Sequence, residues 1–549
     1  MADRNFVDVL TQSVISNWKK KAFSDYEGDT FTYEEVAQWI SRLHILFERN
    51  GLKKGDKVAF LGKNSRHWAI SYMATILYGG VAVPILPEFH ADDITHIIEH
   101  SDTKVFFCQE EMYKKLDPDK FSNLDAIFNH KDFGLISSKV SGYKKDRQDI
   151  DKLLAEKYPD GLTAENFTVP KIDLEDLVTI NYTSGTSGYT KGVVLKYRSF
   201  MANLDYAQNN MPLQAGENIV SFLPLAHTYG CAFDFIFPFS IGCHITFLGK
   251  IPSPQVILKA FQSIKPHLVM FVPLVLEKIY KNKLLPVLNK PAMKILTNIP
   301  GVNKIIFKKI NASLTESFGG NFREIVCGGA ALNKKVETFL TKIGFKFAIG
   351  YGMTECGPLV SYDGWKTRKL TSCGKPVDSL EMKIDSADPQ NEVGEIMVKG
   401  DNVMVEYYKN PEATAAALTE DGWLRTGDLG LLDKDGYCFI KGRNKSLILG
   451  PSGQNIYPEI VEGRINNMPY VIESVVVGRK DRLVALVFAD KEHLNKDGIE
   501  GDEITKVMDK NRHHLNNQLP KFMQVVKFEM MEQEFVKTPK KSIKRFLYE

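Results

Sequence analysis

A polar loop rich in hydroxyls and glycine separates two short apolar runs between residues 177 and 195. Residues 183–188 read Thr-Ser-Gly-Thr-Ser-Gly, a composition that cannot fill a hydrophobic core. The apolar runs on either side, at 177–180 and 193–195, have the length and composition of buried strands. The pattern predicts strand, exposed loop, strand. The hydroxyls and N–H groups of such a loop can surround a polyphosphate, and Lys191 can neutralise its charge.

This loop differs from the phosphate-binding loop of the common nucleoside triphosphatases. That motif requires Gly-Lys-Ser/Thr five residues after its first glycine, whereas Thr190-Lys191-Gly192 stands there when the count starts at Gly185. The sequence therefore predicts a phosphate cradle of another kind. The alternative interpretation is a solvated Ser/Gly linker.

Length and composition limit the class of protein. A chain of 549 residues exceeds what one hydrophobic core organises, so we expect two or more domains. A net charge of +3 gives no argument for nucleic acid or a membrane surface as partner. The seven cysteines form no Cys-x-x-Cys pair, and no signal-peptide layout opens the chain, which favours a cytoplasmic protein.

Most of the chain alternates helical patterns with short apolar strands, which is typical of layered α/β folds. The capping-box spacing of Thr32 and Glu35 predicts a helix start. A βαβαβ-like succession follows, with strands at 57–61, 81–85 and 104–107. Further buried strands are expected at 219–223, 244–248, 267–272 and 324–327.

Two segments between these strands need separate interpretation. The most apolar window, 230–249, contains Asp234, Pro238 and His244. We expect a buried helix and then a strand, separated at Pro238 and Gly242, rather than a membrane span. Residues 281–316 are basic and helical, and predict a surface segment.

The sequence pattern changes after about residue 390, where short apolar runs separated by turn residues predict a β-rich subdomain. A compact α+β pattern follows from about 445. The fold class expected is α/β, with a large N-terminal domain of layered subdomains at 1–442 that includes the β-rich part. A hinge at 443–446 then precedes a small, mobile C-terminal α+β domain at 447–549.

Six motifs occur in order from residue 182 onward. They are Tyr182–Leu195, Pro224-Leu-Ala-His-Thr, Cys327-Gly-Gly-Ala-Ala-Leu, Gly350-Tyr-Gly-Met-Thr-Glu, Gly422-Trp-Leu-Arg-Thr-Gly-Asp and Gly442-Arg-Asn-Lys-Ser. This series resembles the adenylate-forming superfamily of acyl-CoA and aryl-CoA synthetases, adenylation domains and firefly luciferase, over essentially the whole chain. The Gly350 motif, the stretch from Asn402 to Thr414 and the terminal Lys-Arg-Phe resemble bacterial long-chain fatty acid–CoA ligases.

The resemblance implies a two-step reaction. The carboxylate of a medium- to long-chain fatty acid attacks the α-phosphate of ATP, with Mg²⁺, and pyrophosphate leaves. Coenzyme A then displaces AMP to form a thioester. The first step joins two anions, so cations and N–H donors must surround the phosphates. The open alternatives are an acyl carrier protein as acceptor, an aryl or short-chain acid as substrate, and a non-catalytic nucleotide-binding protein.

The resemblance also assigns roles to individual residues. The phosphate loop comprises Thr183, Ser184, Gly185, Thr186, Ser187, Gly188, Thr190 and Lys191. Thr354 would bind the α-phosphate, Glu355 would hold Mg²⁺, and His227 would orient the acyl carboxylate. The other expected nucleotide or coenzyme A contacts are Gly329, Ala330, Ala331, Tyr351, Gly352, Met353, Asp428 (on the ribose), Arg443, Lys445 (at the hinge) and Gly453. Without the resemblance, Glu355 and Asp428 are ordinary surface or turn carboxylates and His227 a core residue.

The C-terminus departs from the family pattern. Related enzymes carry an essential lysine there, and aligning Lys537-Thr-Pro-Lys-Lys-Ser-Ile-Lys-Arg545 puts Ser542 at its position. We expect Lys541 to take this role, with Lys540 and Lys544 as alternatives. The plainer interpretation is a solvated charge run. As partners we expect fatty acid and coenzyme A, no nucleic acid and at most peripheral membrane contact; the sequence predicts no oligomeric state.

Overall fold

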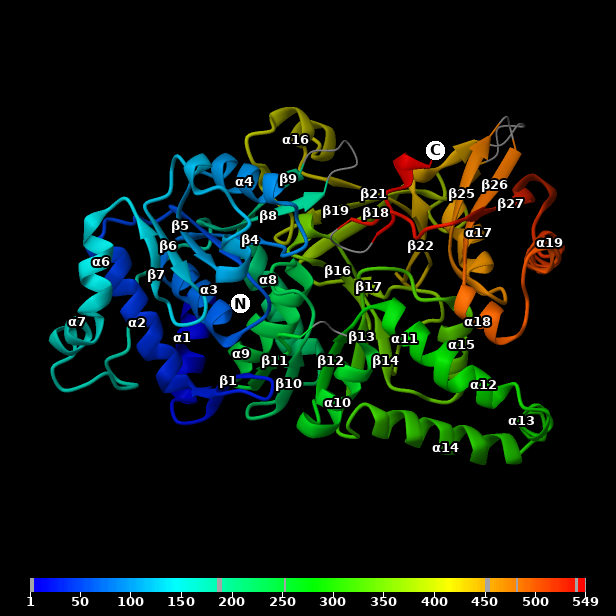
Figure 1. The fold of residues 1–549 in the computed structure, drawn as a ribbon, viewed down its shortest axis with the longest axis horizontal. Helices are drawn as coiled ribbons and strands as arrows, with labels where there is room; N and C mark the ends of the chain where they lie inside the picture. Colours follow the sequence, from blue (N-terminus) through cyan, green and yellow to red (C-terminus); the bar gives the residue numbers. More distant parts are fainter. Residues whose placement is uncertain are drawn as a thin grey trace. The chain divides into compact units, whose positions relative to one another are not determined.

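The computed structural model describes residues 4–184, 190–250, 253–449, 455–479, 482–538 and 542–548. It confirms a mixed α/β fold with a large N-terminal and a smaller C-terminal part (Figure 1). The chain divides into two compact units. The first holds Met1–Thr183, Thr190–Glu381 and Lys399–Gly422, and the second is built mainly from Met382–Val398 and Trp423–Glu549. The predicted hinge at 443–446 stays a prediction.

An eight-stranded sheet carries the strands on both sides of the phosphate loop. Its strand order is β20 (Glu406–Tyr407), β9 (Thr190–Lys196), β8 (Leu177–Ser184), β4 (Val81–Ile85), β3 (Lys57–Leu61), β5 (Thr103–Cys108), β6 (Ala126–Asn129) and β7 (Leu135–Ser138). Parallel strands β3, β4 and β5 confirm the predicted βαβαβ succession. Helix α2 (Tyr33–Arg49) begins at the capping box of Thr32 and Glu35, as predicted.

Two further sheets, parallel except for the antiparallel pairing of β1 (Lys21–Asp25) with β2 (Thr30–Thr32), complete the first unit's main strands. One sheet has the order β10 (Asn218–Ser221), β11 (His244–Phe247), β1 and β2. The second consists of parallel β12 (Leu268–Phe271), β13 (Glu324–Cys327) and β14 (Phe347–Ile349). A small antiparallel sheet of β15 (Tyr351–Gly352), β16 (Leu359–Tyr362) and β17 (Lys375–Pro376) follows directly. The predicted strands at 219–223, 244–248, 267–272 and 324–327 are confirmed within two residues.

Helices cover these sheets in the first unit. They are α1 (Phe6–Ser16), α3 (Arg66–Tyr78), α4 (Ala91–His100), α5 (Glu110–Tyr113), α6 (Ser141–Gln148), α7 (Ile150–Lys157), α8 (Tyr197–Asn210), α9 (Phe237–Ile241), α10 (Pro254–Ile264), α11 (Pro273–Ile279), α12 (Leu285–Leu288), α13 (Pro291–Leu296), α14 (Val302–Ser317), α15 (Lys334–Lys342) and α16 (Pro411–Ala417). Two π-helical turns, η2 (Gly230–Ile236) and η3 (Tyr280–Leu284), precede α9 and α12.

The apolar window at 230–249 folds as a buried helix followed by strand β11, but Pro238 does not interrupt the helix. Pro238 falls in the first turn of α9, where its missing N–H is tolerated, and the helix ends at Gly242 with φ of 90°. Inside this helix, Asp234 accepts the N–H groups of Phe222 and Leu223 at 3.3 and 3.2 Å. Among the described residues, no helix is both long and apolar enough to cross a membrane.

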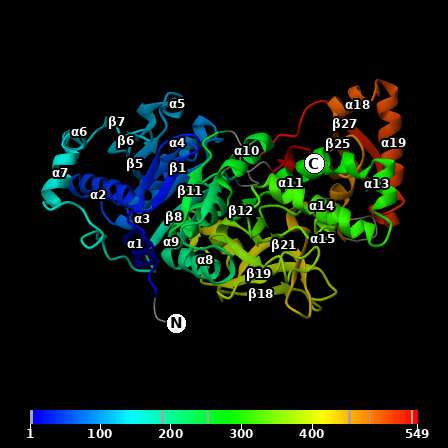
Figure 2. The same cartoon turned by 90° about the horizontal axis from the view of Figure 1, so that it is seen from below.

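The second unit contains two antiparallel or mixed sheets. The first has the order β18 (Leu380–Asp385), β19 (Gly394–Gly400), β21 (Leu424–Leu432) and β22 (Cys438–Arg443), and β18, β19 and β21 lie together in Figure 2. The second is β25 (Val471–Arg479), β26 (Arg482–Ala489) and β27 (Val525–Met531), with the short pair β23 (Ile448–Leu449) and β24 (Asn455–Ile456). Helices α17 (Pro458–Ile465), α18 (Lys491–Lys496) and α19 (Asp502–Asn516) complete the unit.

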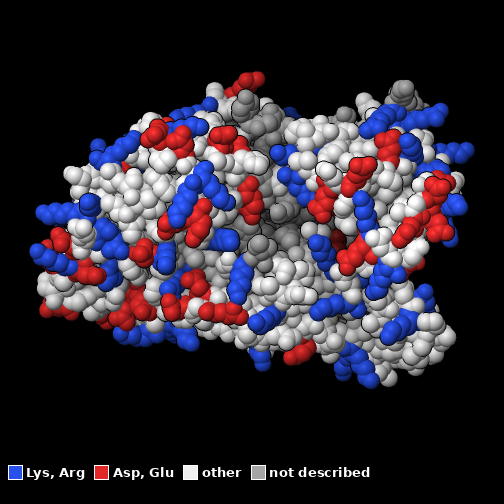
Figure 3. All heavy atoms as spheres, in the orientation of Figure 1, with Lys and Arg blue, Asp and Glu red and all other residues white. Residues whose placement is uncertain are grey.

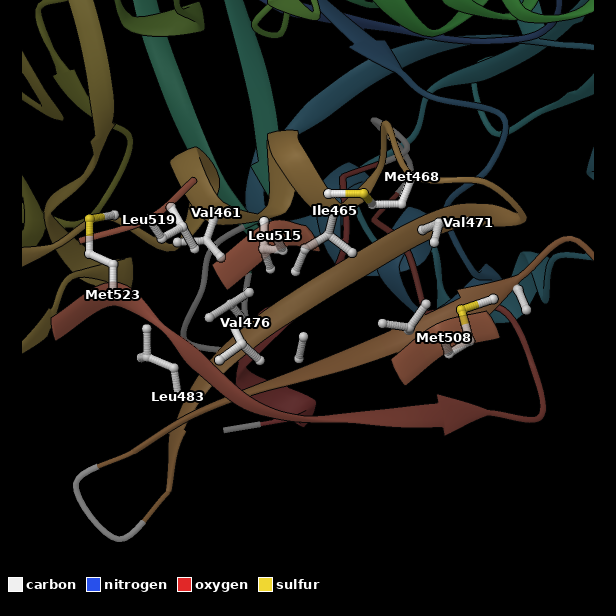
Figure 4. Packing of buried hydrophobic residues seen from close by; sticks show 14 of the residues in the cluster. Val461, Ile465, Met468, Val471, Val476, Leu483, Met508, Leu515, Leu519 and Met523 are labelled. Atoms are coloured by element: carbon white, nitrogen blue, oxygen red, sulfur yellow. The ribbon is translucent and has the colours of Figure 1, made fainter. Parts of the chain in front are cut away.

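A separate hydrophobic core stabilises the C-terminal sheet (Figure 4). Val461 and Ile465 of α17, Val476 of β25 and Leu515 of α19 are all at most 1% exposed. This burial on one face of the sheet, with α17 and α19 across it, gives residues 456–525 a core of their own.

Glu324, the first residue of β13, is a buried carboxyl whose titration should affect stability. It is 1% exposed and accepts hydrogen bonds from the Tyr362 hydroxyl at 2.7 Å and the Trp365 N–H at 2.6 Å. Burial raises the pKa of Glu324 from 4.5 to about 7. The folded state therefore binds the proton more tightly than the unfolded state, which stabilises the fold fully below pH 4.5. That stabilisation is lost as the pH rises through about 7.

We expect Glu324→Gln, which is neutral at every pH, to remove this part of the pH dependence. The wild type should lose up to about 3 kcal/mol of unfolding free energy between pH 4.5 and pH 8, at about 1.4 kcal/mol per pKa unit, and the variant correspondingly less. Urea unfolding at both pH values measures this, with the exposed Glu316→Gln as control. Parallel losses in wild type and Glu324→Gln would contradict the assignment.

Candidate active site

The phosphate loop begins and ends on adjacent strands of the eight-stranded sheet. Thr183 lies near the end of β8, and Thr190 and Lys191 begin β9. The Oγ1 atom of Thr190 is buried and has no hydrogen-bond partner among the described residues. A buried hydroxyl without a partner costs free energy, so this atom fits a site that a ligand completes. Gly185, Thr186, Ser187 and Gly188 lie outside the described residues, as does the side chain of Ser184.

Tyr407 connects Lys191 with Glu355. The Lys191 Nζ lies 4.9 Å from the centroid of the Tyr407 ring, and the Tyr407 hydroxyl donates to Glu355 Oε1 at 2.9 Å. The pairing of β20 with β9 places Tyr407 opposite Val193 and so fixes the ring beside Lys191. Burial and the Glu355 carboxylate raise the pKa of Tyr407, so the hydroxyl keeps its proton and remains a donor. Both predicted phosphate and metal residues thus contact one side chain that the sequence interpretation missed.

The turn that carries Thr354 and Glu355 is fixed on both sides. Asn203 of α8 donates to the Cys356 carbonyl at 3.1 Å and accepts the Leu359 N–H at 2.8 Å. The Glu355 carbonyl accepts the Met404 N–H at 2.8 Å. Gly352 approaches so closely that a Cβ there would meet the Pro358 carbonyl oxygen at 2.4 Å. The turn therefore presents a half-buried Glu355 beside a buried Thr354 in one defined geometry.

The predicted adenine segment follows the carboxyl ends of parallel strands. Gly328 N–H donates to the Phe271 carbonyl at 3.0 Å, and Gly350 N–H to the Cys327 carbonyl at 2.9 Å. These bonds bring the ends of β12, β13 and β14 together, which is where open α/β sheets bind ligands. Gly329 has φ of +85°, a conformation that favours glycine, and the neighbouring Ala330 and Ala331 are exposed. Tyr351 and Met353 lie on the adjacent strand and turn, and their contact with adenine stays a prediction.

His227 lies in a loop that several polar side chains hold between β8 and β13. Asn64 donates to the Leu223 carbonyl at 2.7 Å and accepts the Leu225 N–H at 3.0 Å. Asn181 of β8 donates to the Ala226 carbonyl at 3.4 Å. The Tyr229 N–H donates to His227 Nδ1 at 3.4 Å. The Tyr229 hydroxyl donates to the Val326 carbonyl of β13 at 3.0 Å.

Thr228 is a further candidate that the sequence interpretation did not single out. Its Oγ1 is buried and has no partner among the described residues. The hydroxyl directly after His227 in the Pro-Leu-Ala-His-Thr motif was the available signal. Like Thr190, it is a buried hydroxyl of the first unit that a bound ligand could satisfy.

Asp428 and Arg443 face each other in the second unit. They are directly opposed across β21 and β22, and Arg443 Nε donates to Asp428 Oδ1 at 3.1 Å. Asp428 is only 6% exposed and lies within a strand, so the alternative of a turn aspartate does not hold. Lys445 follows in a short helical turn, Asn444–Ser446. Gly453 lies outside the described residues.

The described residues on the two sides of the predicted lysine contact each other. Lys537 pairs with Ile543, and Thr538 N–H donates to the Ser542 carbonyl at 2.7 Å. Arg545 anchors the C-terminal side through two bonds to the buried Glu462, at 2.7 and 2.9 Å. Ser542 is therefore part of this contact. Lys540 and Lys541 lie outside the described residues.

A single carboxylate, rather than a cluster, is available for a metal ion in the predicted position. Among the described residues no group of three or more His, Cys, Asp or Glu could hold a metal. Glu355 fits Mg²⁺ nonetheless, because this ion is usually held by one or two carboxylates, substrate phosphates and water. The bound ion would offset the negative charge of the phosphates.

We expect Tyr407→Phe to raise the Mg²⁺ concentration that half-saturates the reaction, because Glu355 would bind the ion less tightly. Loss of the hydroxyl leaves the aromatic ring beside Lys191 but frees the Glu355 carboxylate, and such supporting contacts are worth about 10–100-fold in metal affinity or activity. Mg²⁺ titrations of ATP–pyrophosphate exchange measure the half-saturating concentration. Tyr408→Phe is the matched control, because the Tyr408 hydroxyl donates to Asp102 instead, at 2.9 Å. An equal shift in both variants would contradict a specific role for Tyr407.

Comparison with known proteins identifies the family. Residues 11–408 match the AMP-binding enzyme family and residues 445–549 the C-terminal domain of AMP-binding enzymes. Over 84% of this chain and 77% of the relative, the chain is 28% identical to the long-chain-fatty-acid–CoA ligase FadD15 of Mycobacterium bovis. It is 27% identical to the long-chain-fatty-acid–CoA ligase of Bacillus subtilis, over 88% and 84%.

Solved structures of ligases share the fold. The anthranilate CoA ligase AuaEII, in complex with anthranoyl-AMP, superposes with a TM-score of 0.79 at 20% identity, over 99% of this chain and 96% of that one. ATP-bound MatB from Rhodopseudomonas palustris gives 0.75 at 22% identity, over 99% and 98%. The chain therefore belongs to the AMP-binding, adenylate-forming enzymes, whose acid–CoA ligases use ATP, Mg²⁺ and coenzyme A.

Proposed function

We propose that the chain activates a medium- to long-chain fatty acid to acyl-AMP, with release of pyrophosphate, and then transfers the acyl group to coenzyme A. The observation that carries this proposal is the apolar segment next to His227. Every residue of η2, Gly230–Ile236, is buried, and η2 and α8 line a small, largely apolar cavity of about 10 Å³, close to the least volume that holds one water molecule. Its lining is Phe200, Asn203, Leu204, Ala232, Phe233, Ile236 and Phe237. π-Helical turns recur at functional sites.

The cavity and the turn that carries Glu355 share Asn203, which lines the former and fixes the latter. An acyl chain that entered here would thus lie close to the residues assigned to the phosphates. At about 10 Å³ the cavity is far smaller than the 300–1,000 Å³ of typical ligand sites, so any acyl chain requires the side chains around η2 to move apart. Relatives named long-chain-fatty-acid–CoA ligases support the same substrate class.

In this mechanism the chain's residues position and neutralise the reactants. Lys191 and the hydroxyls of Thr183 and Thr190 bind the β- and γ-phosphates, while Thr354 binds the α-phosphate. His227 orients the acyl carboxylate for attack on the α-phosphorus, and the bond to pyrophosphate breaks. The thiol of coenzyme A then attacks the acyl carbon, and AMP leaves. Holding these groups in line replaces an unfavourable encounter of anions with an ordered complex.

Pyrophosphate release from Mg-ATP, measured with acetate through palmitate and oleate to benzoate, with and without coenzyme A, tests the proposal. Release that peaks with long chains and turns over only with coenzyme A is the expected result. A peak with benzoate would favour an aryl acid, as in the 28%-identical relative named 4-coumarate–CoA ligase 4. A burst without turnover would favour a carrier protein, the acceptor named for a 27%-identical chloroplastic relative. No release with any acid would contradict the ligase assignment.

We expect Lys541→Ala to lower the rate of acyl-AMP formation about 10²–10³-fold, the cost of removing one electrostatic contact to a transition state. Initial rates of Lys540→Ala, Lys541→Ala and Lys544→Ala measure this. Lys540→Ala and Lys544→Ala test the two alternative lysines, and Lys544→Ala keeps the backbone bond from the residue 544 N–H to the Val536 carbonyl, 2.9 Å in the wild type. A full adenylation rate in Lys541→Ala would show that another residue replaces the usual lysine.

A further inference from the structure

One segment of the first unit concentrates positive charge. Between Glu277 and Glu316 the sequence contains no Asp or Glu, and it contains no Arg or His either. It contains eight lysines, at positions 278, 281, 283, 290, 294, 304, 308 and 309. The whole chain has a net charge of only +3. We call residues 278–315 the basic lobe.

The basic lobe also exposes large apolar side chains. Between Ile279 and Phe307 no residue is buried, although η3, α12, α13 and the start of α14 are helical. The exposed apolar side chains are Val287 (43%), Ile295 (65%), Leu296 (37%), Ile299 (41%) and Ile305 (60%). Figure 3 shows Lys among uncharged residues over this part of the face, at the lower right. Helices with apolar side chains that the fold does not cover mark an interaction surface.

We propose that the basic lobe docks on the surface of an anionic lipid bilayer. Helices that lie in a membrane interface combine exposed aliphatic residues with lysines that reach the head groups. Anionic lipids attract such lysines over about one Debye length. The composition also argues against a protein partner, because protein interfaces are enriched in Arg and aromatic residues and depleted in Lys. The absence of arginine from 278–315 is opposite to that pattern.

The lobe is attached to the nucleotide end of the first unit. Helix α11 follows β12 directly, and the Glu277 side chain accepts the Asn333 N–H at 2.8 Å. Asn333 lies two residues after Ala331, in the segment that follows the carboxyl end of β13. Docking of the basic lobe on a bilayer would therefore bring the first unit to the membrane, into which long-chain acids partition. This docking goes beyond the proposed function, since none of its residues takes part in the reaction.

Vesicle sedimentation tests the docking without any measurement of catalysis. The full-length protein is mixed with phosphatidylcholine vesicles, or with vesicles of 70% phosphatidylcholine and 30% phosphatidylglycerol, a fraction set on the order of natural anionic content. We expect at least tenfold tighter binding to the anionic vesicles, and loss of most of this difference in high salt. Equal or no binding to both would overturn the proposal.

Two sets of substitutions separate charge from apolar contact. Lys290→Gln/Lys294→Gln/Lys308→Gln/Lys309→Gln should weaken binding to anionic vesicles at least tenfold, and Ile295→Gln/Ile305→Gln several-fold. All six side chains are exposed, so folding should be unaffected. The matched control is Lys144→Gln/Lys145→Gln in α6, which should bind as the wild type does. An equal loss in the control, or unchanged vesicle binding with lost binding to an acidic acyl carrier protein, would overturn bilayer docking.

Discussion

Glu355→Gln should lower the rate of acyl-AMP formation about 10²–10³-fold, the scale of losing a principal electrostatic contact in a transition state. The substitution keeps the size of the side chain and an oxygen that can accept the Tyr407 hydroxyl, but it removes the negative charge that Mg²⁺ requires. Raised Mg²⁺ should recover part of the rate, because a weakened site fills at higher ion concentration. ATP–pyrophosphate exchange at a series of Mg²⁺ concentrations measures both effects.

Glu406→Gln provides the control for Glu355→Gln. Glu406 is exposed, lies on β20 next to Tyr407 and carries the same charge. It should retain the wild-type rate and Mg²⁺ dependence. If Glu355→Gln keeps the wild-type rate, or if both variants lose it equally, Glu355 does not hold the ion.

Asp428→Ala should lower kcat/KM for ATP by about 100-fold or more. One carboxylate that accepts two ribose hydroxyls makes two hydrogen bonds to a charged group, each worth about 1.5–3 kcal/mol. The decisive measurement uses 2′-deoxy-ATP and 3′-deoxy-ATP. The wild type should discriminate against both analogues. Asp428→Ala should have the same kcat/KM for the analogues as for ATP, because the carboxylate that would accept the 2′- or 3′-hydroxyl is already gone.

Loss of the Arg443 ion pair is a second effect of Asp428→Ala, and it needs a control of its own. Arg443 is largely exposed, so screening by solvent keeps its contribution to stability small. Asp385→Ala on β18 removes another carboxylate of the second unit, 3.7 Å from Arg425. It should leave kcat/KM and the discrimination between ATP analogues unchanged. Persistent discrimination in Asp428→Ala would show that another group binds the ribose.

Short-range rules predicted much of the fold. The capping box of Thr32 and Glu35, the strands at 57–61 and 81–85 and the buried helix followed by a strand within 230–249 follow from neighbouring residues, although the π-helical form of that helix was not predicted. Pro238 was misjudged because its effect depends on its place in a helix: at the first turn of α9 it removes no hydrogen bond that the helix needs.

The supporting contacts of the site were not predictable from local pattern, because they join distant segments. The Tyr407 hydroxyl reaches Glu355 over 52 positions, and Asn64 reaches Leu225 over 161. Tyr407 lies in the stretch from Asn402 to Thr414 that resembles the family, but the sequence pattern assigned it no role, and Asn64 does not differ from an ordinary surface or core residue. The motifs located the groups assigned to phosphate and metal, and only the folded chain identified what holds them.

The net charge did not reveal the basic lobe. A total of +3 averages this lobe with an acidic remainder, so it carries no information on where the charges gather. The distribution of charged residues over the surface, rather than their sum, indicates which partners a protein attracts.

The absence of buried side chains between Ile279 and Phe307 has a consequence for the dynamics of the chain. Helical amides that lack a core beneath them open locally at a free energy far below that of global unfolding. Amide hydrogens of α12 and α13 should therefore exchange with solvent before those of β12 and β13. Because this stretch contributes so little to cooperative unfolding, its side chains can change over evolutionary time without unfolding the enzyme.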